Sequence, residues 1–340
     1  MKLPLKLNNE NDIYYNCTKP YSYNLFWYMI DGGRGIGKTT TFLIDGLHQV
    51  EKGYQFVYLR RYKSEIKEFV HKNSMAKILD DVIYKGDGNG GYTMLWGDVI
   101  LGYIVPLSVQ RSYKSSNFDK VNRIIYDEAI VRQSATYRYL QNEVTDLFEF
   151  MSTVFRTRTN VKTILLGNNE DIFNPFAAFF HIPLFQTTYV DKERGIYCEH
   201  AKNSPKLIEQ EKQTGLYALT KGTTYGDYHY DNKVLGADKI TVSLKPTNAK
   251  LLFRLVFNEQ TVNIYTCNTN PPILYCERRD KIIKDNITYI ILEEGEINYL
   301  YIDIYRKKLR SFVYRYYFNG NIQYNDEKAG SILKWLIEQA

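Results

Sequence analysis

Eight residues near the start of the chain read Gly32-Gly33-Arg34-Gly35-Ile36-Gly37-Lys38-Thr39. They match the pattern G-x-x-x-x-G-K-[ST] in full, which is the phosphate-binding loop of P-loop NTPases. Glycines let the backbone adopt conformations that are closed to other residues, so that successive N–H groups can point toward phosphate oxygens. The pattern predicts that Lys38 reaches the β- and γ-phosphates of a nucleotide and that the Thr39 hydroxyl coordinates Mg²⁺.

The residues around this loop supply the context that the motif requires. Residues 25–30 form a short apolar run that predicts a buried parallel strand. Residues 40–47 indicate the start of a helix, whose N-terminus adds the positive end of its dipole to the phosphate site. A glycine-rich turn that binds no nucleotide has no need of this strand–loop–helix order. The sequence therefore predicts an α/β fold that contains a P-loop NTPase domain.

A second signature lies farther along the chain, where residues 121–128 read VNRIIYDE. An apolar run that ends in two carboxylates is the Walker B pattern of the same enzymes. Asp127 is predicted to hold Mg²⁺ and Glu128 to polarise the attacking water. Strands that end in Asp-Glu are common by chance, so the complete P-loop upstream gives this pattern its weight.

Two further groups of polar residues follow predicted strands. Asn168 ends the buried strand at 161–167, where a polar side chain can sense the γ-phosphate, although an Asn-rich turn explains it equally well. The strand at 54–59 is followed by the residues Arg60-Arg61-Tyr62-Lys63. Ligands of open α/β sheets bind at this carboxyl end, while a solvated loop is the equal alternative.

The remaining patterns divide the chain into three parts. Residues 1–23 are polar and without a clear period, and we expect an arm that packs loosely or contacts a neighbour. Residues 83–106 predict a β-hairpin insertion at the sheet edge, and residues 141–154 a helix that ends at Phe155-Arg156-Thr157-Arg158. We predict an ATPase domain at 1–195, a polar linker at 196–237 and a second α/β domain at 238–340.

The second domain is rich in strand patterns. A hairpin is predicted from its strands at 250–257 and 260–266, followed by a strand at 273–276 and a terminal helix around 334–338.

Composition limits the class of protein. The chain has 340 residues, 44% of them hydrophobic and 24% charged, which is typical of a globular protein with room for two domains. Its formal net charge of +6 permits a polyanionic partner without requiring one. The four cysteines show no metal-binding spacing, and no apolar run reaches membrane-spanning length, so we expect an intracellular protein without a membrane partner.

At this point the order of the motifs resembles a known family. The order is GGRGIGKT, FVYLRRYKSE, VPLSVQRSYKSS, RIIYDE, FMSTVFRTR and NPFAAFF. It is similar to that of the DNA-packaging ATPases of small protein-primed tailed phages, the phi29-like group, most specifically over residues 24–183. The resemblance implies an additional-strand, ring-forming P-loop ATPase. It also implies partners: double-stranded DNA, further copies of the chain in a ring, expected to be a pentamer, and the portal vertex of a procapsid in the host cytoplasm. Part of the family also uses a structural RNA.

The resemblance also assigns roles to basic residues. Arg156 matches an arginine finger that acts on a neighbouring subunit's nucleotide, although an arginine at a helix end is also favoured by the helix dipole. Lys114 matches a lysine that can reach a neighbour's nucleotide. The candidate nucleotide-binding residues are therefore the eight residues of the loop, Asn168 and Lys114. The candidate catalytic residues are Glu128, Lys38 and Arg156, the metal ligands are Thr39 and Asp127, and the cofactors are ATP and Mg²⁺.

The second domain resembles the RNase H-like nuclease fold of large terminases. Active terminase nucleases bind two metal ions with clustered acids, but the segment at 263–267 reads NIYTC without a carboxylate, and Asp303 is isolated. We therefore predict a vestigial domain that does not cut. The basic run at 306–310 is expected to contact nucleic acid or to form a solvated face. Two other functions stay open: a terminase with an active nuclease, and a nucleotide-gated assembly or binding protein.

Overall fold

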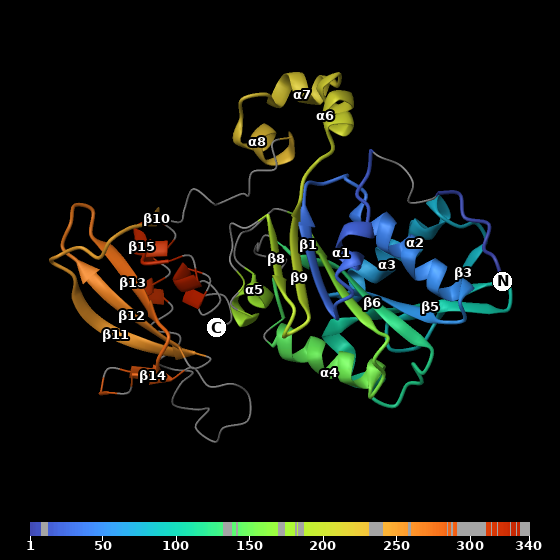
Figure 1. Ribbon diagram of the computed structural model, residues 1–340, viewed down its shortest axis with the longest axis horizontal. Coiled ribbons are helices and arrows are strands. Elements are labelled where there is room, and N and C mark those ends of the chain that lie inside the picture. Colours follow the sequence, from blue (N-terminus) through green and yellow to red (C-terminus); the bar gives the residue numbers. More distant parts are fainter. Residues whose placement is uncertain are drawn as a thin grey trace. The chain divides into compact units, whose positions relative to one another are not determined.

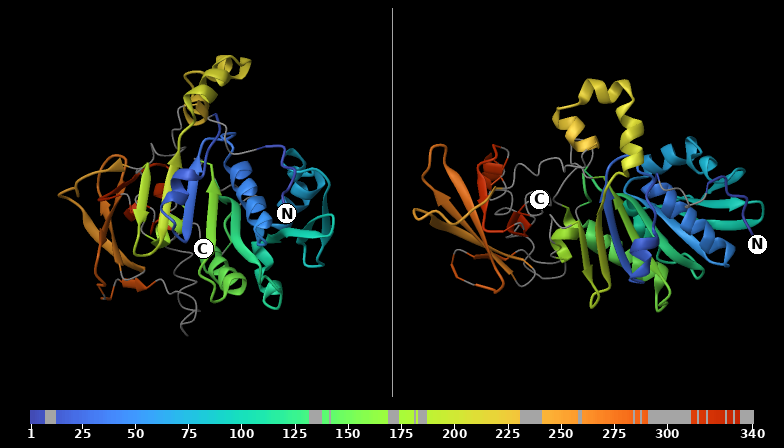
Figure 2. Two further views of the ribbon diagram at one scale, coloured as in Figure 1. Left: turned by 45° about the vertical axis from the view of Figure 1, so that its right-hand side comes forward. Right: turned by 45° about the horizontal axis from the view of Figure 1, so that its top comes forward.

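The computed structural model (Figures 1 and 2) describes residues 1–7, 13–131, 138–140, 142–168, 174–180, 182, 187–230, 241–257, 260–283, 285–286, 288–290, 311–313, 315–317, 319–326, 328–330 and 332–333. The chain divides into two compact units. Unit 1 comprises Met1–Asp171 and Gln186–Leu235, and unit 2 comprises Ile172–Phe185 and Gly236–Ala340.

Unit 1 is built on a sheet whose strands follow the order β3-β4-β5-β2-β6-β7-β1-β9-β8. The strands are β1 (Trp27–Gly32), β2 (Gln55–Arg60), β3 (Val82–Gly86), β4 (Tyr92–Trp96), β5 (Val99–Pro106), β6 (Val121–Ile130), β7 (Lys162–Gly167), β8 (Thr188–Asp191) and β9 (Ile196–Ala201). The six strands from β5 to β9 in this order are parallel, and β3, β4 and β8 add antiparallel pairs at the two edges.

The position of β7 settles the class of this sheet. It lies between β1, which leads into the phosphate loop, and β6, which carries the Walker B carboxylates. An extra strand between these two is the defining feature of the additional-strand P-loop fold, so the predicted fold class is confirmed. Because all three strands run parallel, their carboxyl ends meet at one edge of the sheet.

Helices cover both faces of the sheet. The helices of unit 1 are α1 (Thr18–Ser22), α2 (Lys38–Glu51), α3 (Lys63–His71), α4 (Glu143–Phe155), α6 (Pro205–Lys212), α7 (Gly215–Thr220) and α8 (Thr224–Tyr230), with 3₁₀ turns η1 (Ser74–Lys77) and η2 (Leu107–Tyr113). On β1, Tyr28 packs into the core that contains Phe42 of α2. The ring of Trp27, the preceding residue, contacts Phe148 of α4. Successive strand residues point to opposite faces, so α2 and α4 lie on opposite sides of the sheet (Figure 1).

The N-terminal arm differs from the expected loose segment. Leu3 is buried, and its backbone N–H donates to Glu51 at the end of α2. The Tyr15 ring lies 6.0 Å from Phe42, and the Thr41 hydroxyl donates to the Tyr15 carbonyl. Scattered apolar residues in this polar stretch therefore hold it against α2, although they have no regular period in the sequence.

Two other expectations need correction. Residues 83–106 do form antiparallel strands at the sheet edge, but β5 also pairs in parallel with β2, so it belongs to the main sheet rather than to an insertion. The range 196–237, predicted as a linker, begins with β9, which pairs with β1 along its whole length. The short apolar run of β9 was hidden by the polar residues that follow it, and these form α6 to α8 (Figure 2).

Unit 2 contains a second sheet of order β10-β15-β13-β12-β11-β14. Its elements are α5 (Pro175–Phe180), β10 (Thr241–Val242), β11 (Lys250–Phe257), β12 (Gln260–Cys267), β13 (Ile273–Arg279), β14 (Thr288–Ile290) and β15 (Ile322–Tyr324). Strands β11, β12 and β13 form an antiparallel meander, which confirms the predicted hairpin and the strand after it, and β14 pairs in parallel with β11. Asp303, the basic run at 306–310 and the predicted terminal helix lie outside the described residues.

In the part of the chain that the structure describes, no helix combines the length and apolar character that crossing a bilayer requires.

Candidate nucleotide site and catalytic centre

The phosphate loop connects β1 to α2 and borders a cavity of about 260 Å³. Gly37, with φ at +90°, forms the left-handed turn from which α2 starts. The cavity is lined by Gly35, Ile36, Gly37, Lys38, Thr39, Thr40, Asp127, Glu128, Gly167 and Asn168. The loop, the Walker B carboxylates and the polar residue after β7 are thus brought together at the carboxyl ends of β1, β6 and β7.

The start of the loop is packed against β9. A Cβ atom on Gly32 would lie 2.3 Å from the carbonyl oxygen of Ala201, and the φ of Gly32 is +148°. Only glycine fits this position, because any side chain would collide with the neighbouring backbone. Gly32, Gly33 and Arg34 do not line the cavity, but the first two accept hydrogen bonds from Lys38 Nζ at 3.0 and 2.7 Å.

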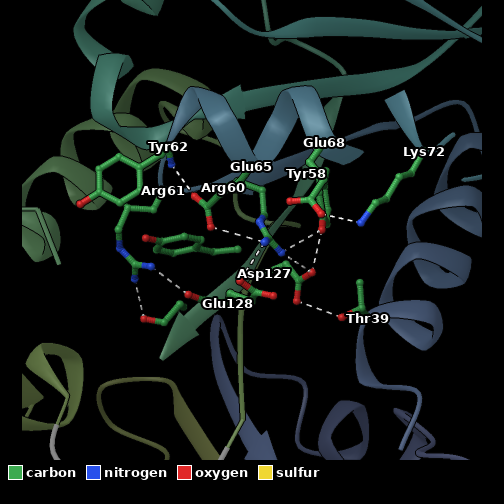
Figure 3. A network of polar contacts seen from close by, with 12 residues as sticks. Thr39, Tyr58, Arg60, Arg61, Tyr62, Glu65, Glu68, Lys72, Asp127 and Glu128 are labelled. Atoms are coloured by element: carbon green, nitrogen blue, oxygen red, sulfur yellow. Dashed lines mark hydrogen bonds and ion pairs between the residues drawn. The ribbon is translucent and has the colours of Figure 1, made fainter. Parts of the chain in front are cut away.

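The two predicted metal ligands contact each other directly. The Thr39 hydroxyl donates to Asp127 Oδ1 at 2.9 Å (Figure 3). A hydroxyl and a carboxylate are the hard oxygen donors that Mg²⁺ prefers. The donor set at this point therefore fits the metal that the P-loop pattern predicts.

Arg60 at the end of β2 joins the two carboxylates. Its Nη1 lies 3.0 Å from Asp127 Oδ2, and its Nη2 lies 2.8 Å from Glu128 Oε2 (Figure 3). The Tyr58 hydroxyl donates to the same Asp127 oxygen at 2.6 Å, and Glu65 lies 3.4 Å from Arg60. With a side chain 13% exposed, Arg60 is thus a partly buried member of the site rather than a charge on a solvated loop.

These contacts act on the protonation of Glu128. Burial raises the pKa of the Glu128 carboxyl, the charge of Arg60 opposes that shift, and the nearby Asp127 carboxylate adds to it. The net effect is a pKa above the usual value for glutamate. A carboxylate whose pKa is raised is a stronger base once it is ionised.

Arg61, the next residue, is also buried. Its guanidinium forms a two-point contact with Glu143, the first residue of α4, and donates to the backbone carbonyls of Glu128 and Ala129. The Arg61–Glu143 pair could not be recognised from the sequence, because the two residues are far apart in the chain and each alone resembles a surface charge.

A second cavity, of about 1050 Å³, adjoins the first. Gly35, Gly37 and Thr40 line both cavities. The rest of its lining comes from the N-terminal arm, including Tyr14 and Asn16, and from α2, including Ile44 and His48. Sequence reasoning missed this cavity because the arm has no motif and no period.

The two residues predicted to act on a neighbouring subunit do not line the nucleotide cavity. Arg156 follows the last residue of α4, has a side chain 61% exposed, and lies 3.6 Å from Asp119. Lys114 is 57% exposed and lies 3.4 Å from Glu149. Arg158, by contrast, donates to the carbonyls of Phe118, Asp119 and Val121, which ties the end of α4 to the start of β6.

Comparison with known proteins supplies the biological setting. The family model described as "Podovirus DNA encapsidation protein (Gp16)" matches residues 9–339. The chain belongs to this family of podovirus DNA encapsidation proteins. The DNA packaging protein of Bacillus phage phi29 is 27% identical over 335 residues, covering 94% of this chain and 95% of the relative. That of Bacillus phage B103 is 27% identical over 288 residues, covering 84% and 88%.

Solved structures of two packaging motors have the same fold as this encapsidation protein. The structure described as "The Phi-28 gp11 DNA packaging Motor" aligns with a TM-score of 0.68 and 16% identity, over 96% of this chain and 97% of that one. "The bacteriophage Phi-29 viral genome packaging motor assembly" aligns with a TM-score of 0.60 and 23% identity, over 96% and 99%. With its complete P-loop and Walker B strand, this encapsidation protein is an ATPase.

In unit 2 of the encapsidation protein, the described carboxylate nearest the predicted nuclease position is Glu277, and its partners lie on β12 and β13. Asn263 on β12 is paired in register with Glu277 on β13 and donates to its carboxylate at 3.3 Å. The Tyr265 hydroxyl and Arg279 also bind Glu277, so both of its oxygens have partners. Among the described residues, no group of three or more His, Cys, Asp or Glu side chains converges as a metal site would require.

Proposed function

We propose that this encapsidation protein is an ATP-driven motor that moves double-stranded DNA into a procapsid, acting as a ring of subunits at the portal vertex in the host cytoplasm. The observation that carries the proposal is that one cavity is lined by the phosphate loop, by Asp127 and Glu128 of β6, and by Asn168. Membership of the DNA encapsidation family supplies the substrate, and the likeness to two packaging motors supports the assembly.

The residues of the cavity have separate tasks in this proposal. The loop from Gly32 to Thr39 holds the phosphates of ATP, with the Lys38 ammonium on the β- and γ-phosphates. Thr39 and Asp127 hold Mg²⁺, which, when bound, neutralises charge on the phosphates. Glu128 orients the attacking water and accepts its proton, and Asn168 senses the γ-phosphate from the end of β7.

The adjoining cavity is suited to the rest of the nucleotide. It is continuous with the phosphate loop and is bounded by the aromatic ring of Tyr14 and the polar side chains of Asn16 and His48. An aromatic ring can stack on a base, and amide or imidazole groups can bond to its edge or to a ribose. We therefore assign the adenosine part of ATP to this cavity, and the N-terminal arm becomes part of the site.

In this proposal the ring completes the catalytic centre. Arg156 and Lys114 extend to the nucleotide of a neighbouring subunit, where a guanidinium stabilises the charge of the transferring phosphoryl group. Their exposure, and their position outside the cavity of their own subunit, support this role. A pentameric ring at the portal is the assembly that we infer from the resemblance to the phi29-like group, part of which also uses a structural RNA.

We further propose that unit 2 is a vestigial RNase H-like domain that does not cut DNA. The meander β11–β12–β13 with β14 parallel to β11 supports the fold, and the absence of carboxylates on β11 and β12 supports the loss of cutting. Incubation of the purified chain with supercoiled plasmid and Mn²⁺ should leave the plasmid intact. Metal-dependent nicking would show an active nuclease.

The function is tested by ATP hydrolysis with and without DNA and procapsids. We expect turnover that rises when both are added, and loss of turnover in Lys38→Ala and in Glu128→Gln. Either variant with wild-type hydrolysis would show that the site is assigned wrongly. A nucleotide-gated binding protein would instead bind ATP and show no hydrolysis in a single-turnover assay.

A further inference from the structure

The backbone of Glu128 has an uncommon conformation. Its φ is +53°, in the left-handed region that residues with a Cβ atom rarely adopt. It lies where the pairing of β6 with β7 slips: Tyr126 is paired with Leu165, and the next pair joins Ile130 to Gly167. Three residues of β6, 127–129, thus lie opposite the single residue 166 of β7, which forms a bulge. Bulges redirect side chains beside active sites, and this one brings the Glu128 carboxylate to the cavity wall.

The Arg61 side chain binds the backbone of this bulge. Its Nη1 donates to the Glu128 carbonyl at 3.1 Å, and its Nη2 donates to the Ala129 carbonyl at 2.9 Å. Buried carbonyls need hydrogen-bond donors, and irregular backbone cannot obtain all of them from a neighbouring strand. In Figure 3, Arg61 lies to the left of Glu128 and contacts the backbone, while Arg60 lies above and contacts the carboxylate.

Glu143 in turn fixes Arg61. The distances are 2.7 Å from Nε to Oε2 and 2.6 Å from Nη2 to Oε1, and both side chains are fully buried. The Tyr126 hydroxyl and the Leu140 backbone N–H also donate to the Glu143 carboxylate. The aromatic ring of Tyr139 lies 4.9 Å from the guanidinium carbon. The guanidinium is therefore held in one orientation.

A pair of this kind needs an explanation other than stability. Two fully buried opposite charges contribute little more to stability than well-packed apolar side chains of the same volume. What apolar side chains cannot supply is a pair of donors aimed at the carbonyls of Glu128 and Ala129. We propose that Arg61, oriented by Glu143, is a positioning residue that fixes the backbone of Glu128 and so aims its carboxylate at the reacting water. This inference depends on the proposed role of Glu128.

Loss of Arg61 should affect the hydrolysis step and nucleotide binding differently. Arg61 is not among the residues that line the nucleotide cavity, so loss of Arg61 should leave nucleotide binding unchanged. The hydrolysis step should slow, because a misplaced general base loses much of an effect that is worth about 10²–10⁴-fold. A purely structural role would instead lower stability and binding together.

The test uses the full-length chain with Arg61→Met/Glu143→Met, which removes both charges and so leaves no unpaired buried ion. Single-turnover hydrolysis should fall by about 10- to 100-fold, while the Kd for a nonhydrolysable ATP analogue stays within about twofold. The matched control is Arg123→Met/Asp45→Asn, which removes another buried ion pair, 3.2 Å apart, near the start of β6. This control should hydrolyse ATP at the wild-type rate. A wild-type rate in the Arg61/Glu143 variant, or an equal loss in the control, overturns the proposal.

A second arm asks whether Arg61 acts through Glu128. The Arg61/Glu143 changes are added to Glu128→Gln, and residual single-turnover hydrolysis is measured. If Arg61 works only by aiming Glu128, its loss has no further effect in that background. If the combined variant instead loses hydrolysis by the product of the two separate fold-losses, the proposal is overturned. Wild-type hydrolysis in Glu128→Gln alone would instead overturn the role of Glu128 itself, which distinguishes the two failures.

If the double variant does not give folded protein, Arg61→Lys carries the same test. One compact ammonium group cannot serve two carbonyls and two carboxylate oxygens at once. We expect the same fall in hydrolysis with unchanged Kd, and an undiminished single-turnover rate in this variant would overturn the proposal.

Discussion

At the scale of single residues, Arg60 acts on the charge of Glu128, the proposed general base. Its guanidinium lies within 3.0 Å of both Asp127 and Glu128. Because a nearby positive charge favours the ionised form of a carboxyl group, Arg60 lowers the pKa that burial and Asp127 raise at Glu128. In the proposed mechanism, Glu128 is thereby kept ionised over a wider range of pH.

The corresponding prediction concerns the pH dependence of turnover in Arg60→Gln. Glu128 accepts a proton only when it is ionised, so its activity is lost as the pH falls through its pKa. Without Arg60 that pKa rises further, and the acid limb of the kcat profile should move to higher pH. The measurement is kcat at saturating ATP from about pH 5 to pH 9. Arg60→Lys retains the charge and should keep the limb closer to wild type; identical limbs in wild type and Arg60→Gln would contradict the prediction.

Sequence alone indicated the residues whose chemistry depends on fixed local spacing. Lys38 and Thr39 follow from the loop pattern, and Asp127 and Glu128 follow from their place at the end of an apolar run. Arg61 and Glu143 could not be paired in this way, because their contact depends on how the loop after β2 folds over α4. No local pattern encodes such a contact.

At the scale of elements, the contact between the phosphate loop and β9 determines how closely β1 and β9 can pack. The Gly32 Cα faces the Ala201 carbonyl with no room for a methyl group. Strand β9 was also the element least visible in the sequence, because its six residues lie at the start of a polar stretch. The strands β1, β2, β6 and β7 were all predicted, since each is a distinct apolar run.

This packing predicts a specific cost for Gly32→Ala. The new Cβ would displace the backbone of β9 and strain β1, so the free energy of unfolding should fall by about 2–4 kcal/mol. Gly53→Ala is the matched control, because Gly53 also has positive φ, at +90°, but has nothing within 4 Å of the added atom. It should lose only about 1 kcal/mol. Urea denaturation followed by circular dichroism measures both, and equal losses would show that the close contact is unimportant.

At the scale of the whole molecule, the proposed ring would place part of the catalytic machinery, Arg156, on a neighbouring subunit. The chain by itself exposes Arg156 at one end of α4 and keeps Glu128 in its own cavity. Arg158, only two residues away, is instead bound to backbone carbonyls. The two arginines should therefore respond differently to substitution.

Mixed assemblies test this division. Subunits with Arg156→Ala are combined with subunits with Glu128→Gln, each inactive alone. Some interfaces then join an intact Glu128 to a neighbour's intact Arg156, and hydrolysis should partly recover. Arg156→Ala should leave Tm unchanged, whereas Arg158→Ala should lower it. An absence of recovery at every mixing ratio, with assembly confirmed, would count against a shared site.

Helix α4 has a consequence for timing around such a ring. It begins with Glu143, which binds Arg61, the residue that contacts the backbone of Glu128. The residue after its end is Arg156. Thirteen helical residues form a stiff rod about 20 Å long. If Arg156 binds the nucleotide of a neighbouring subunit, a small tilt of α4 would shift Glu143 and Arg61. The position of Glu128, the proposed general base of the same subunit, would then change as well. Subunits would then hydrolyse ATP one after another, and α4 alone would couple each active site to the next.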